Sequence, residues 1–136
     1  MIEVYIDGAS AGNPGPSGAG IFIKGHGSAE KYSVPLGSMS NHEAEYYALI
    51  HGLKICLEKN YRTVSFRTDS ELVDRAVEKR FAKNKKFSPL LEEALLMADE
   101  LDLFFMKWIP SAENKTADEL ARLAIRKNNP NDMQNS

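Results

Sequence analysis

The sequence has a single cysteine, Cys56, among 136 residues. One cysteine cannot form a disulfide within the chain, which fits a reducing compartment. Because Cys56 lies in an apolar stretch with helical spacing, we interpret it as a small buried hydrophobe rather than a nucleophile. The sequence also lacks an apolar run near the roughly 18 residues of a membrane span, and a basic segment at its start. We therefore expect a cytoplasmic protein that does not enter membranes.

An excess of charge of either sign is absent as well. The chain has 17 Lys and Arg residues against 19 Asp and Glu residues, a net charge of −2. Overall charge alone therefore gives no basis for binding nucleic acid. Hydrophobic residues at 43% and charged residues at 26% are typical of a soluble globular protein.

The length and the absence of repeats predict one domain. We place this domain at residues 1–127 and expect the polar residues 128–136 to form a disordered tail. Alternating apolar residues predict strands at 2–7, 18–24, 31–36, 63–68 and 103–109. Apolar residues at helical spacing predict helices at 43–59, 71–80, 89–101 and 114–127. Residues 8–17 are rich in Gly and Pro and are predicted to form a loop.

This order of elements indicates an α/β fold, a mixed sheet with helices on its faces. The strands that end at Asp7 and Asp69 are separated by a long helix, so they can be parallel neighbours. Both carboxylates would then lie at the carboxyl end of the sheet, where open α/β sheets place their sites.

Two further acids can join this pair. Glu45 lies on a helix that is otherwise small and apolar, and Asp118 lies near the start of the last helix. Acids without a local His or Cys partner favour a hard cation such as Mg²⁺ or Mn²⁺ and, with it, phosphate chemistry. Each acid also has an ordinary interpretation: Asp7 and Asp69 as turn residues, and Asp118 as a favourable charge at a helix N-terminus. Glu45 is the hardest to explain in this way, because charged residues are seldom enclosed without a partner.

Four ordered motifs resemble the type 1 ribonucleases H. They are YIDGASAGNPGP at residues 5–16, SNHEAEY at 40–46, TDS at 68–70, and WIP followed by ENKTADELA within 108–121. The resemblance covers about residues 1–127, and four motifs in order are far more specific than one.

The resemblance implies a ribonuclease H-like fold with a five-stranded mixed sheet and helices on both faces. It also implies a two-metal mechanism that uses Mg²⁺, with Mn²⁺ as a substitute. Carried over, Asp7 bridges both ions, Glu45 and Asp69 complete the first ion's site, and Asp118 holds the second. The implied substrate is the RNA strand of an RNA–DNA hybrid, cut to leave 5′-phosphate and 3′-hydroxyl ends. We expect a monomer.

Substrate contacts are expected from the loop after Asp7 and from polar residues beside the other acids. The small residues of that loop let the backbone approach a 2′-hydroxyl group. The candidate substrate-binding residues are Gly8, Ala9, Ser10, Asn13, Ser40, Asn41, His42, Ser70 and Asn114. Asn13 could instead begin a turn, and Ser40 could cap a helix.

The sequence departs from the family pattern at three places. Residues 110–113 lack the histidine that many members carry before the fourth acid, and His42 stands where many relatives have Asn. The other histidines, His26 and His51, are interpreted as structural or solvated. The segment Arg75–Lys86 has six basic residues and one acid, a local charge of +5, where some relatives have a longer basic protrusion. This charge could bind phosphate or could simply be a solvated surface.

Two alternatives to a nuclease follow. The departures above would fit a module that binds hybrid or RNA and cleaves poorly or not at all. A phosphorylated receiver or phosphatase also places acids at strand ends. It expects parallel strand–helix units from the start, whereas this sequence places two hairpin strands before its first helix.

Overall fold

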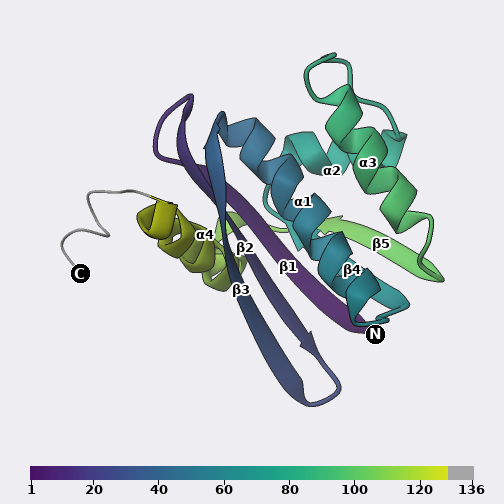
Figure 1. Ribbon diagram of the computed structural model, residues 1–136. Helices are drawn as coiled ribbons and strands as arrows, with labels where there is room; N and C mark the ends of the chain where they lie inside the picture. Colours follow the sequence, from purple (N-terminus) through teal and green to yellow (C-terminus); the bar gives the residue numbers. More distant parts are fainter. Residues whose placement is uncertain (129–136) are drawn as a thin grey trace.

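A computed structural model describes residues 1–128 of the chain (Figure 1). The strands and helices follow in the order β1 (Ile2–Ser10), β2 (Gly15–Gly25), β3 (Ser28–Met39), α1 (Asn41–Glu58), β4 (Thr63–Thr68), α2 (Glu71–Lys79), α3 (Ser88–Ala98), β5 (Leu103–Trp108), the 3₁₀ turn η1 (Ser111–Glu113) and α4 (Lys115–Asn128). They build a five-stranded mixed sheet in the order β3-β2-β1-β4-β5. The predicted fold class is confirmed.

The central strand β1 pairs with β2 in antiparallel and with β4 in parallel orientation. The parallel pairing ends at Ile6 and Thr68, so Asp7 and Asp69 come next at the same edge of the sheet. As predicted, α1 lies in the crossover between these two strands.

The predicted end of the first strand at Asp7 is wrong. β1 continues to Ser10, because Gly8, Ala9 and Ser10 pair with residues of β2. The turn between the two strands is therefore limited to residues 11–14. A Cβ added at Gly8 would lie 2.2 Å from the Ala44 carbonyl carbon, so this glycine serves close packing against α1 rather than a turn.

Helices cover both faces of the sheet (Figure 1). α1 packs where Gly8 leaves room for it, and α4 packs on the opposite face where Gly20 leaves room for the Ala117 carbonyl, 2.0 Å from where a Cβ would stand. Ser40 caps α1 in a capping box with Glu43, as the sequence predicts. Both helices are thus fixed close to the end of β1 that carries Asp7.

The prediction of a core strand at 103–109 needs correction. β5 is an edge strand, and Leu103, Phe105 and Trp108 are 52%, 48% and 41% exposed. The apolar run comes from one face that packs on Phe66 through Phe104, while the other residues face outward.

At the C-terminal end, α4 includes Asn128, one residue past the predicted domain end. The rest of the expected disordered tail, residues 129–136, lies outside the described residues. None of the helices in residues 1–128 combines the length and hydropathy that crossing a bilayer requires.

Candidate active site

Three carboxylates from three elements meet at the edge of the sheet where the parallel pairing ends. Asp7 comes from β1, Glu45 from the second turn of α1, and Asp69 directly follows β4. Their ligand oxygens all lie within 4.8 Å of one another. Asp7 and Glu45 are each only 7% exposed, and Asp69 is half-buried. The structure therefore brings together three of the four acids that the sequence singled out.

The fourth acid, Asp118, reaches the same place from the first turn of α4. It lines the same pocket as the other three acids, and its charge is among the causes that raise the pKa of Asp7. Its Oδ2 also accepts a hydrogen bond from Nε of Arg122, one turn along the helix, at 3.0 Å. The arginine thus partly neutralises the acid that lies on the outer side of the cluster.

The electrostatics of the cluster oppose full ionisation. Burial, followed by the charges of Glu45 and Asp69, raises the pKa of Asp7 to about 10. Burial likewise raises the pKa of Glu45 to about 7, although the Gly8 backbone N–H donates to this carboxylate and stabilises its charged form. Carboxylates held this close require protons or a cation between them at neutral pH.

The donor set fits a divalent cation of the hard class. Every contributing atom is a carboxylate oxygen, the ligand type that Mg²⁺ and Mn²⁺ prefer. Within residues 1–128 no other group of three or more His, Cys, Asp or Glu side chains converges in this way. Zinc is disfavoured because neither Cys nor His contributes to the cluster.

A pocket of about 710 Å³ opens over the acids. Six of the predicted substrate-binding residues line it: Gly8, Ala9, Ser10, Asn41, His42 and Ser70. Asn13 lies outside this lining, exposed in the turn between β1 and β2. Asn114 is buried at 1% exposure, so its placement does not present the side chain to a substrate.

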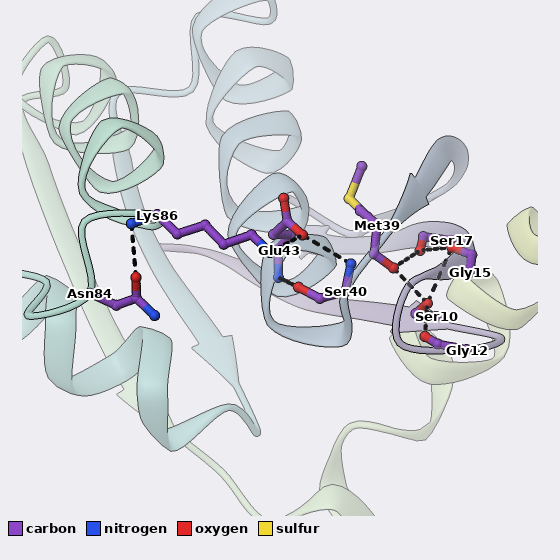
Figure 2. A network of polar contacts seen from close by, with 9 residues as sticks. All are labelled: Ser10, Gly12, Gly15, Ser17, Met39, Ser40, Glu43, Asn84 and Lys86. Carbon is purple, nitrogen blue, oxygen red and sulfur yellow. Dashed lines mark hydrogen bonds and ion pairs between the residues drawn. The ribbon is translucent and has the colours of Figure 1, made fainter.

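Hydroxyl groups near the pocket are occupied in holding backbone segments together (Figure 2). Ser10 Oγ donates to the Met39 carbonyl at 2.9 Å, which ties the end of β1 to the end of β3. Ser40 Oγ accepts from the Glu43 N–H at 3.2 Å, and Glu43 in turn accepts from the Ser40 N–H. Ser40 therefore acts as the helix cap in this structure.

The basic segment Arg75–Lys86 borders a second pocket, of about 720 Å³, next to the first. The two pockets share His42 and Leu72 in their linings. The second is lined by the cations Arg75, Lys79 and Lys83 together with Phe81 and Phe87. Lys86 contacts Glu43 at 3.4 Å, which links this segment to the start of α1 (Figure 2).

Some lining residues were not found from the sequence. Arg122 and Ile125 line the main pocket from α4, Leu72 from α2 and Ser111 from the turn η1. Arg122 could have been found, since its spacing of four residues from Asp118 places both on one helix face. His26, in the turn between β2 and β3, and His51, in α1, lie outside the linings of both pockets.

Comparisons with known proteins agree with this geometry. The sequence model of the family described as reverse transcriptase-like matches residues 6–124. "Putative hydrolase EbsB" of Enterococcus faecalis is 44% identical, over 96% of this chain and 98% of that protein. Ribonuclease H of Desulforamulus reducens is 34% identical, over 94% of this chain and 89% of that protein.

A solved structure of a ribonuclease H has a similar fold. The crystal structure of LC11-RNase H1, isolated from compost, in complex with an RNA/DNA hybrid superposes with a TM-score of 0.85 at 30% identity. The match covers 93% of this chain and 98% of the other.

Proposed function

The chain belongs to the type 1 ribonuclease H family and is a ribonuclease H hydrolase, and we propose that it cuts the RNA strand of RNA–DNA hybrids by a two-metal mechanism. The observation that carries this proposal is the convergence of Asp7, Glu45 and Asp69 within 4.8 Å, with Asp118 beside them. The carboxylates of this site become fully ionised only when cations lie between them. Divalent cations are also what stabilises the charge that develops during phosphodiester hydrolysis.

Two Mg²⁺ ions, or Mn²⁺ in their place, would activate the attacking water and stabilise the departing 3′ oxygen, leaving 5′-phosphate ends. Asp7, which faces all three other acids, would be a ligand of both ions. Glu45 and Asp69 would complete the site of the first, and Asp118 would complete the site of the second. The Gly8 N–H holds the Glu45 carboxylate in its place.

The pocket suggests how the two strands of a hybrid would lie. The RNA strand is assigned to the acids and to the small residues Gly8, Ala9 and Ser10, whose backbone a 2′-hydroxyl can approach. The DNA strand would pass over Asn41 and His42 toward the cations of the second pocket. The acids and the pocket are complete within one chain, so a monomer would suffice for this reaction.

Cleavage of an end-labelled RNA–DNA hybrid tests the proposal. The hybrid is incubated with the protein in Mg²⁺ and in Mn²⁺, next to single-stranded RNA and duplex DNA, with Asp69→Asn as the control. We expect the wild type to cut only the hybrid and the variant to leave it intact. Cleavage that persists unchanged in Asp69→Asn would point to a contaminating nuclease or another site and would contradict the proposal.

A second candidate is a module that binds the hybrid without cutting it. The turn η1 supports this candidate, because it presents Ser111 to the pocket and residues 110–113 contain no histidine. Binding of intact hybrid in both metals, measured by fluorescence anisotropy on folded protein, would favour the module. Turnover of the hybrid would exclude it.

A further inference from the structure

Asn114 connects the two elements that carry Asp7 and Asp118. Its side chain is 1% exposed, and its Nδ2 donates to the Ile6 carbonyl at 2.9 Å. Ile6 is the residue directly before Asp7 on β1. The Asn114 backbone carbonyl accepts the N–H of Asp118 at 3.1 Å, the first turn of α4. One residue therefore bonds to the neighbour of one acid and to the backbone of the other.

The hydrogen bonds of this amide set it apart from an ordinary helix cap. A capping Asn uses its Oδ1 to accept an N–H of the first helical turn. In Asn114 the Oδ1 is buried and has no hydrogen-bond partner among residues 1–128, while the Nδ2 donates to the Ile6 carbonyl of β1. The side chain therefore acts here as a donor to β1, whereas a helix cap uses a side-chain oxygen as an acceptor.

The hydrogen bond from Asn114 joins α4 to β1 at the point where two acids repel each other. Asp7 and Asp118 line the same pocket and carry like charges when ionised. Repulsion between them would move the start of α4 away from β1 unless something held it. Among residues 1–128, the next side-chain hydrogen bond between the sheet and α4 is donated by Ser33 Oγ to the Leu120 carbonyl at 2.5 Å, more than a turn further along the helix.

We propose that Asn114 is a positioning residue that sets the separation of Asp7 and Asp118, and thereby the affinity of the site for divalent cations. The inference rests on the proposed function only in taking these acids as metal ligands. Partners that orient ligands without touching the metal typically change its affinity about 10- to 100-fold when mutated.

The experiment compares Asn114→Ala and Asn114→Leu with Ser33→Ala. Both Asn114 variants lose the donor to the Ile6 carbonyl and add no charge beside the acids, and Asn114→Leu keeps the approximate volume of the buried side chain. Ser33→Ala is the matched control, because it removes a hydrogen bond of the same kind between α4 and the sheet without touching the acids. Binding of Mn²⁺ and Mg²⁺ is measured by calorimetry, together with the melting temperature and the Mg²⁺ dependence of hybrid cleavage.

We expect both Asn114 variants to bind metal at least about tenfold more weakly, with the loss of cleavage recovered at high Mg²⁺. Ser33→Ala should lower the melting temperature and leave metal affinity unchanged. Unchanged affinity in a folded Asn114 variant would overturn the proposal, as would an equal loss in Ser33→Ala. A wild type that binds metal but cuts no hybrid would contradict the proposed function alone, since the calorimetric comparison would still decide the role of Asn114.

Discussion

The charge on the carboxyl groups of Asp7 and Glu45 depends on whether protons or a divalent cation are bound at the site. Their pKa values stand at about 10 and about 7, against ordinary values of 3.8 and 4.5, because both are buried among other acids. The folded protein without metal thus binds protons that the unfolded chain releases. A divalent cation can take the place of these protons.

This difference predicts how stability depends on pH. Since both pKa values are raised by folding, the stabilisation by bound protons is complete below about pH 4 and is lost as pH rises through about 7 for Glu45 and toward about 10 for Asp7. In EDTA the melting temperature should therefore fall from pH 5 to pH 9. In Mg²⁺ it should fall much less, so the gap between the two curves should widen with pH. A gap that stays constant over this range would contradict the role of these acids in binding metal.

Single residues also mark the limit of what the sequence could predict. Glu45 was identifiable because a charge on an enclosed helix face needs a partner. Asn114 was not, because a family motif gives the residue type but not the direction of its side chain, which points to the Ile6 carbonyl. Whether a polar residue faces substrate or backbone depends on packing between segments 108 residues apart.

At the scale of elements, two glycines, one on β1 and one on β2, set how closely the helices approach the sheet. Gly8 admits α1, which carries Glu45, and Gly20 admits α4, which carries Asp118. A Cβ at Gly8 would lie 2.4 Å from the Glu45 backbone nitrogen, and one at Gly20 would lie 2.7 Å from that of Ala121. Backbone atoms cannot yield as a flexible side chain can, so either helix would have to move as a whole.

We therefore expect Gly8→Ala and Gly20→Ala each to destabilise the protein by about 1–3 kcal/mol or more, and to raise the Mg²⁺ concentration needed for half-maximal cleavage. Gly37→Ala is the control, because a Cβ there meets nothing within 4 Å. Thermal denaturation and Mg²⁺ titration measure both effects. If Gly20→Ala had the same melting temperature and the same Mg²⁺ response as Gly37→Ala, α4 would not pack this closely against the sheet.

Local signals explain which elements the sequence located well. The capping box at Ser40 and the strand Thr63–Thr68 depend on neighbouring residues, and both were predicted. The extension of β1 to Ser10 and the edge position of β5 depend on pairing with distant segments. Glycines that allow a helix to approach look the same in the sequence as glycines of a turn.

For the whole molecule, the distribution of charge matters more than its sum. The net charge is −2, yet the segment from Arg75 to Lys86 carries six cations, and three of them line the pocket next to the acids. This segment is evident in the sequence, but only the folded chain places it beside His42 at the edge of the main pocket. The cations and the acids thus lie next to each other, as strand binding and phosphodiester cleavage require.

If the cations of this segment bind the phosphates of the hybrid, replacing them should reduce the salt dependence of binding. Each phosphate contact contributes a slope of about 0.7–0.9 in a plot of log affinity against log salt concentration. Lys79→Ala and Lys83→Ala should each reduce that slope by up to this amount, measured on an Asp69→Asn background to prevent cleavage. Lys54→Ala, an exposed lysine on α1, is the control. Equal slopes in all variants would show that the basic segment Arg75–Lys86 makes no phosphate contacts and is simply solvated.

The central claim is that the clustered acids make this protein a metal-dependent nuclease. The most direct measurement is the single-turnover rate of hybrid cleavage at saturating Mg²⁺ by the wild type and by Asp7→Asn. This substitution keeps the shape of the side chain and removes a repelling charge, so the variant should remain folded. We expect its rate to fall by at least about a thousandfold while the hybrid still binds. A rate within a few fold of the wild type would contradict it.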